Sequence, residues 1–238
     1  NGRPDLPGAS KFVQPNATWN FNASGVLQKN APNTPRFEYD PETGEFLGLL
    51  LEKEYNNLNP NSEVPDKSYF DPLIYTNDLP GPYGELASRV TAGCGTTRGL
   101  EGLNTNICAY VYVNPLSNYR LTFGTAGSGM NNSTLGGGSN AWMDTYNFDT
   151  ESWEQRRRPW RIKKLSNGWY RFALQYRTGN TYQGSNINCA VLKDGVDATT
   201  VINTNIKINS NESAQFGFSC AMMVKISDYS QEETPQYI

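Results

Sequence analysis

Apolar and polar residues alternate with a period of two along most of this chain, which predicts β-strands in preference to helices. Short alternating runs lie between residues 17 and 28. A hairpin signal follows at residues 35–52, where an Asp-Pro pair and Gly44 mark a tight turn between two apolar arms. The second arm, residues 46–51, is continuously apolar, so we expect it to be a covered strand in the core.

The alternation resumes in the second half of the chain and no amphipathic helix interrupts it. Tyr170, Phe172, Leu174 and Tyr176 share one strand face, and Trp160 and Ile162 alternate with Arg161 and Lys163 as in an edge strand guarded by charge. Strands are predicted at 107–113, 119–123, 140–148, 156–164, 169–176, 187–192, 201–208 and 214–226. About ten to fourteen strands of this spacing predict an all-β fold, a two-sheet antiparallel sandwich of the jelly-roll or concanavalin-like kind.

The segments between these runs are rich in loop-forming residues. Residues 1–16 carry prolines and little periodicity, which predicts an extended arm followed by one sandwich domain over residues 17–238. Residues 55–82 are predicted to form a long loop and residues 93–102 a glycine-rich turn. We expect the aromatic residues of the long loop to pin it to the sandwich, with a ligand surface as the alternative; these are Tyr69, Phe70, Tyr75 and Tyr83.

Composition narrows the class of protein. The chain is 37% hydrophobic and 12% aromatic with a mean hydropathy of -0.62, which fits a thin sandwich core with long polar loops. Its net charge of -3 is too near neutral to predict nucleic acid or an anionic membrane as the partner. No apolar run reaches the roughly 18 residues of a membrane span.

Candidate chemistry is limited by the absence of histidine, which excludes Ser-His-Asp and Cys-His catalysis. Carboxylate catalysis remains open, and the acidic residues that cluster in sequence are Asp144, Asp149, Glu151 and Glu154. Acidic residues on loops are ordinarily solvated, so we expect no enzymatic activity. Asp- and Asn-rich loops offer the oxygen ligands that calcium prefers, which leaves a structural calcium ion open, although no EF-hand spacing occurs.

The four cysteines, Cys94, Cys108, Cys189 and Cys220, are widely spaced and form no CxxC pair. This spacing argues against a zinc site or a redox motif. Three of them lie in apolar runs, where cysteine usually behaves as a small buried hydrophobe. We therefore expect buried free thiols in preference to disulfides.

Four segments in order resemble jelly-roll domains of bacteriophage tail and tail-fibre proteins. The first is the hairpin Arg36–Glu52, and the second is Asn57-Leu58 followed by Asn61-Ser62-Glu63. The third is the Asn-Gly-Trp-Tyr-Arg turn at residues 167–171, and the fourth is the terminal Thr234–Ile238. The chain departs from the family pattern at Cys220–Lys225, where those domains have a Gly-x-Gln-x-Glu strand. The resemblance implies a lectin-like virion component, often trimeric, that assembles with other virion proteins and meets polysaccharide on a bacterial surface.

Sugar binding would require exposed aromatic rings beside amides and carboxylates. The densest such set comprises Asn140, Trp142, Asp144 and Tyr146, with Trp153 and Tyr182 on later segments. Core positions for Trp142 and Tyr146 are the competing interpretation. The competing function is a capsid-decoration or tail-assembly protein that has no sugar ligand.

Overall fold

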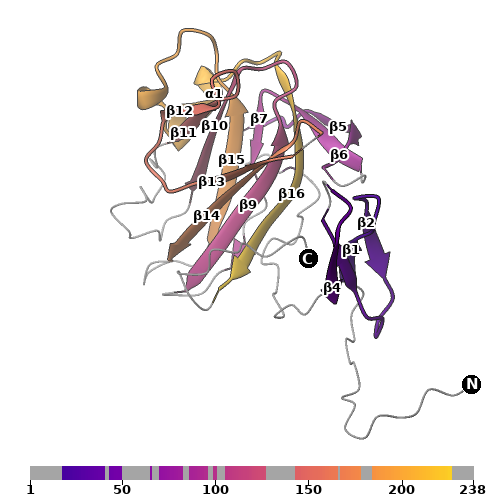
Figure 1. Cartoon of the computed structure of the whole chain (residues 1–238). Helices are drawn as coiled ribbons and strands as arrows, with labels where there is room; N and C mark the ends of the chain where they lie inside the picture. The colour runs from indigo at the N-terminus through magenta and orange to yellow at the C-terminus, as the bar shows by residue number, and fades with distance from the viewer. Residues whose placement is uncertain are drawn as a thin grey trace, which may run out of the picture. The chain divides into compact units, whose positions relative to one another are not determined.

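The computed structural model describes residues 18–40, 43–49, 65, 70–82, 86–95, 99–100, 105–126, 143–165, 167–177 and 184–226. Within these ranges the chain is almost entirely antiparallel β-structure (Figure 1). The predicted arm at residues 1–16 and the terminal motif at residues 234–238 lie outside the described residues. In the described part of the chain, no helix has the length and apolar character required to cross a membrane.

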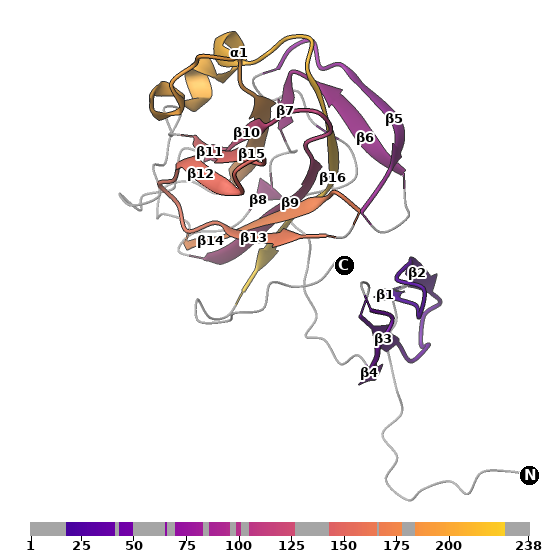
Figure 2. The same cartoon turned by 45° about the horizontal axis from the view of Figure 1, so that its top comes forward.

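Two six-stranded sheets form the sandwich (Figures 1 and 2). One has the order β13 (Arg161–Lys164), β14 (Tyr170–Arg177), β9 (Asn106–Asn114), β16 (Gln215–Lys225), β6 (Leu86–Thr91) and β5 (Tyr75–Pro80). The other has the order β12 (Ser152–Gln155), β11 (Asp144–Asn147), β10 (Arg120–Ala126), β15 (Gly184–Val191) and β7 (Gly93–Gly95), and β8 (Gly99–Leu100) also pairs with β15. The predicted all-β sandwich is confirmed.

The main core lies between the two sheets because each contributes one apolar face. Phe123 of β10 stacks on Phe172 of β14 with ring centroids 4.2 Å apart, which joins the two layers directly. The residues predicted to share a face of β14 are all buried in this core, namely Tyr170, Phe172, Leu174 and Tyr176. Alternation on one strand therefore predicted correctly which side chains fill the sandwich.

The charged edge strand is also confirmed. β13 ends its sheet, with Trp160 buried just before it and Arg161 and Lys163 exposed along it. The turn to β14 closes with a hydrogen bond from Leu165 N to Trp169 O, 2.8 Å long, and places Gly168 at a φ of +81°. Outward charges at a free sheet edge disfavour pairing with another chain.

The strand predicted at residues 201–208 is wrong, because this part of the chain is mostly helical. A smaller apolar cluster lies beneath this helical segment. The structure has the short helices η1 (Ala198–Thr200), η2 (Asn203–Asn205) and α1 (Ile206–Asn209) there. Asp197 caps η1, and the Asn205 side chain accepts from Ile202 N at 2.8 Å. These local side-chain bonds compete with sheet pairing. The cluster beneath comprises Phe70, Met143, Ala190, Leu192, Ala198, Val201 and Ile206.

Two predicted loops contain strands. β5 lies inside the segment 55–82, and β7 lies inside the glycine-rich turn at 93–102. Glycine suits β7 because a Cβ on Gly93 would overlap the Phe70 ring and lie 2.8 Å from Cys189 O. Phe70 is buried, as expected of a residue that pins the loop, whereas Tyr75 is 38% exposed; Tyr69 and Tyr83 lie outside the described residues.

The described strands of residues 18–49 form two hairpins, which we call the two-hairpin unit. β1 (Thr18–Phe21) pairs with β2 (Leu27–Asn30), and β3 (Phe37–Tyr39) pairs with β4 (Phe46–Leu49). The Asn20 side chain donates to Phe37 O at 2.7 Å and so links the hairpins. The chain divides into two compact units with a boundary between residues 53 and 54, and among the described strands β1 to β4 pair only with one another.

The hairpin predicted at residues 35–52 is present, but its second arm is not a covered strand. Phe46, Leu47 and Leu49 are 57%, 58% and 48% exposed. Phe46 contacts Tyr39 and Phe37 with ring centroids 5.4 and 6.1 Å apart. A hairpin has only two strands, and an apolar arm is buried only where another layer covers it.

Candidate functional site

The residues predicted to bind sugar fall into three groups in the structure. Asn140, Trp142 and Tyr182 lie outside the described residues. Asp144 and Tyr146 belong to β11 and are buried, and Trp153 of β12 is half-buried. The structure therefore brings Tyr146 and Trp153 together, but not as an exposed binding surface.

Asp144 holds a buried ion pair. Arg158 Nη1 donates to its Oδ2 at 3.1 Å and Trp160 Nε1 donates to the same oxygen at 2.9 Å, while the backbone N of Arg157 donates to Oδ1. The Asp144 and Arg158 side chains have no exposed surface, and burial lowers the pKa of Arg158 while the carboxylate of Asp144 opposes that shift. The Asp144 carboxylate thus links β11 to residues 157–160 through these hydrogen bonds. Asp144 is therefore not part of the candidate site.

Tyr146 belongs to the aromatic core. Its ring meets Phe148 and Trp153 edge-on at 5.2 Å and Phe172 at 5.5 Å, and burial raises the pKa of its phenol. It is 6% exposed, so its ring cannot stack on a sugar. The Arg156 guanidinium lies 5.8 Å from the Trp153 ring, which places a cation beside the one predicted aromatic that is still partly exposed among those described.

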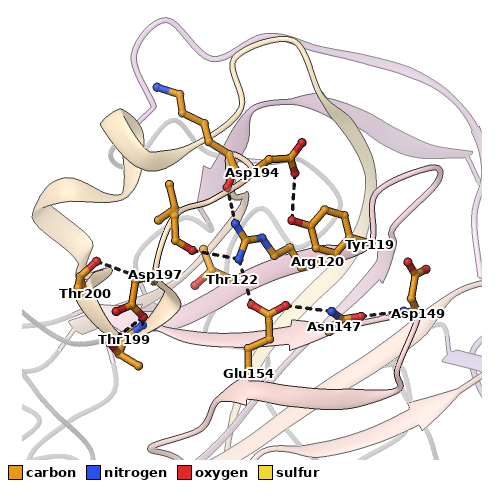
Figure 3. A network of polar contacts seen from close by, with 12 residues as sticks. Tyr119, Arg120, Thr122, Asn147, Asp149, Glu154, Asp194, Asp197, Thr199 and Thr200 are labelled. Atoms are coloured by element: carbon orange, nitrogen blue, oxygen red, sulfur yellow. Dashed lines mark hydrogen bonds and ion pairs between the residues drawn. The ribbon is translucent and has the colours of Figure 1, made fainter.

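A polar network on the outer face of β10, β11 and β12 is a better candidate (Figure 3). We call it the Arg120 network, and its members are Tyr119, Arg120, Asn147, Glu154 and Asp194. Arg120 and Asn147 are register partners on β10 and β11. Because Leu121 enters the core, alternation turns Arg120 to the opposite face. Neighbouring strands therefore present polar side chains together.

Arg120 is the centre of this network. Its Nη1 donates to Glu154 Oε2 at 3.0 Å and to Val196 O at 3.1 Å, and its Nη2 donates to Lys193 O. The side chain is only 7% exposed, whereas that of Glu154 is 28% exposed. The guanidinium thus fixes the turn at residues 193–196 against β12 and fixes the position of the Glu154 side chain.

The other members are held by direct hydrogen bonds. Tyr119 OH donates to Asp194 Oδ1 at 3.0 Å, and Asn147 Nδ2 donates to Glu154 Oε1 at 2.9 Å. The guanidinium of Arg120 lies 5.3 Å from the centre of the Tyr119 ring. Partial burial and the bond to Asp194 raise the pKa of Tyr119, so its phenol stays neutral and able to donate.

Asp197 lies beside this network at the start of η1. Its carboxylate accepts from Thr199 N at 2.9 Å and from Thr199 Oγ1 at 2.8 Å. These bonds lower the pKa of Asp197. The carboxylate is therefore used as a helix cap.

The Arg120 network offers a partly exposed phenol ring, two carboxylates and an amide in fixed positions. This combination suits hydrogen bonding to hydroxyl groups with an aromatic face alongside. Among the described residues, no group of three or more His, Cys, Asp or Glu side chains is placed to hold a metal ion.

Sequence reasoning missed most of this network. The sequence suggests Glu154 only as a candidate catalytic carboxylate, and it places Arg120 only within the predicted strand 119–123. Asp194 lies 75 positions from Tyr119 in the chain. The one usable signal was the Lys193-Asp194-Gly195 turn, which ends a predicted strand and so brings a carboxylate to a sheet end.

No protein-family model matches the sequence, and no curated protein matches it. Among solved structures, the chain is similar to the enzymatically active domain of tailspike protein 4 of bacteriophage CBA120. The similarity covers 71% of this chain and 21% of that chain, with a TM-score of 0.38 and 9% sequence identity. This chain therefore spans about a fifth of that tailspike chain, and no activity or ligand is transferred from it.

Proposed function

We propose that this chain is a component of a bacteriophage virion and that its sandwich domain binds polysaccharide of the host surface without cleaving it. The virion assignment is supported by the four ordered motifs described in the sequence. The observation that carries the binding assignment is the Arg120 network, in which the buried Arg120 guanidinium fixes the Glu154 carboxylate and the Tyr119 hydroxyl fixes the Asp194 carboxylate. Fixed acceptors beside an aromatic face match the alternating hydroxyl and apolar faces of a sugar ring.

The pairing of the carboxylates with cations supports binding over hydrolysis. A glycosidase needs one carboxyl that carries a proton and a second that acts as base or nucleophile. Glu154 is paired with Arg120, Glu151 with Lys164, and Asp144 with Arg158. Each of these three carboxylates is already engaged in an ion pair, which supports a role in structure or as a hydrogen-bond acceptor over a role in catalysis.

A host-polysaccharide array tests the proposal. Tyr119→Phe and Glu154→Gln each remove one hydrogen bond of the network, and Asp194→Asn removes a negative charge. All three keep the shape of the network, and each should lower the array signal several-fold. Asp78→Asn is the matched control, because Asp78 pairs with Arg89 in a partly exposed ion pair on β5 and β6. Equal signals from all four variants and the parent would refute binding at this network.

Hydrolysis is tested separately with the same polysaccharides. We expect no new reducing ends after prolonged incubation with the parent protein. Release of oligosaccharides that Glu154→Gln abolishes would show instead that the network is catalytic.

An assembly protein without a sugar ligand is the second candidate, and the two-hairpin unit favours it. Val26, Phe37, Phe46, Leu47 and Leu49 are each at least 44% exposed in that unit. Exposed apolar clusters often mark contacts with other proteins. Sedimentation of the purified chain tests for the homotrimer that the motifs imply, and labelling in intact particles distinguishes a tip position, expected for host binding, from a capsid position.

A further inference from the structure

Two of the buried cysteines are direct neighbours across paired strands. Cys94 of β7 and Cys189 of β15 are register partners in an antiparallel ladder. Neither forms a disulfide in the structure, both are fully buried, and both belong to the main core. Register partners in an antiparallel pair project their side chains to the same face. The two thiols therefore lie side by side on the inner face of one sheet.

The ladder gives the spacing of the two backbones. Val191 N donates to Ala92 O at 3.0 Å, and these residues lie two positions beyond Cys189 and two before Cys94. This bond flanks the Ala190–Gly93 pair, so Ala190 and Gly93 form a non-hydrogen-bonded pair and the next pair, Cys189 and Cys94, is a hydrogen-bonded pair. The Cα atoms of such a pair lie about 5.5 Å apart, within the range of about 4.4 to 6.8 Å that disulfides span.

We propose that Cys94 and Cys189 form an inter-strand disulfide when the protein meets a low-molecular-weight disulfide such as oxidised glutathione. The Cys94 thiolate attacks one sulfur of the oxidant, forming a mixed disulfide and releasing one glutathione thiolate. The Cys189 thiolate then attacks the Cys94 sulfur and releases the second. The two cysteine protons pass to the two glutathione molecules, so one disulfide is reduced for each that forms.

The order of attack follows from the fold. β7 has three residues and ends the strand order of its sheet, so its opening needs less disruption than that of β15, which pairs on both sides. Burial raises the pKa of the Cys189 thiol, which makes it a poor first nucleophile. Opening of β7 exposes Cys94 to the oxidant, and its return brings the mixed disulfide to Cys189.

Cys108 provides a matched control. It is buried on β9 in the other sheet, where its register partners are Gln175 and Val224. Burial also raises its pKa to about 12. It thus resembles Cys189 in burial and pKa but faces no cysteine across either paired strand.

The experiment treats the folded full-length protein with oxidised glutathione, blocks remaining thiols in denaturant, and maps peptides by mass spectrometry. We expect the intact protein to lose the mass of two hydrogen atoms, to keep two of its four cysteines open to alkylation, and to yield one linked peptide pair containing Cys94 and Cys189. Cys108→Ala should retain this link. Cys94→Ala and Cys189→Ala should each lose it.

The parent protein alone can overturn the proposal, so a variant that fails to fold does not weaken the test. Retention of all four alkylatable thiols after oxidation would contradict it. A link that involves Cys108 or Cys220 would also contradict it. Because the bond would close a long loop of chain, oxidation should also raise Tm, and reduction should reverse the rise.

Discussion

The sandwich and the two-hairpin unit use similar residues to different effect. In the sandwich, Phe123 and Phe172 come from facing sheets and are fully buried. In the two-hairpin unit, Phe46 contacts aromatic residues of its own hairpin and stays 57% exposed. A second apolar layer therefore determines burial, and the hydrophobicity of a strand does not.

The largest contrast should appear when an aromatic ring is removed from each region. Phe172→Ala should lower the free energy of unfolding by about 3 to 5 kcal/mol because it leaves a cavity between the sheets. Phe46→Ala should cost below about 1 kcal/mol because its ring is already largely in water. Urea denaturation measures both, and similar losses would show that Phe46 is covered in solution.

A second contrast lies between buried and exposed charges. Asp144→Ala leaves Arg158 buried without its carboxylate and should cost about 3 kcal/mol. Asp78→Ala breaks the partly exposed pair with Arg89 and should cost below about 1 kcal/mol. Parallel urea titrations test this difference, and a negligible loss in Asp144→Ala would mean that Arg158 finds another partner.

Disturbing the packing of β7 should cause a loss of stability of intermediate size. Gly93→Ala should destabilise the sandwich by about 1 to 3 kcal/mol because the added methyl group meets Phe70 and the Cys189 carbonyl. Thermal melts measure the loss. Phe70→Leu combined with Gly93→Ala should recover part of it, and a full loss in the double variant would show that the carbonyl contact dominates.

The smallest expected effect depends on pH. The pKa of Asp197 is lowered from its usual 3.8, so its cap stabilises the fold above that value and the contribution is lost as pH falls through the lower folded-state pKa. Asp197→Asn should therefore lower Tm slightly at neutral pH and have a diminishing effect in acid. A constant difference across this range would show that ionisation of Asp197 is not involved.

The sequence predicted the sandwich well because alternation reports directly which face of a strand is apolar. It failed at residues 201–208, where the caps at Asp197 and Asn205 override the pattern, and at β7, where glycines fit a strand beneath Phe70. It also failed at Phe46, because a pattern within one strand cannot tell whether another layer covers it. The caps are local, whereas the failures at β7 and Phe46 concern packing between distant segments.

The candidate site was harder to predict for the same reason. Asp144 and Tyr146 have the residue types of a sugar site but are buried, because Tyr146 packs against Phe172 of the other sheet and Asp144 pairs with the buried Arg158. The Arg120 network gathers Tyr119, Asn147, Glu154 and Asp194 from four separate segments. Their proximity follows from strand register, which cannot be read from any one of these segments.

Hydrogen exchange measured by mass spectrometry, with and without host polysaccharide, tests the central claim most directly. Binding at the Arg120 network should slow amide exchange in peptides that cover residues 119–123, 147–154 and 193–197, and should leave residues 37–49 of the two-hairpin unit unchanged. Slowed exchange confined to residues 37–49, or no change with any host polysaccharide, would contradict the account.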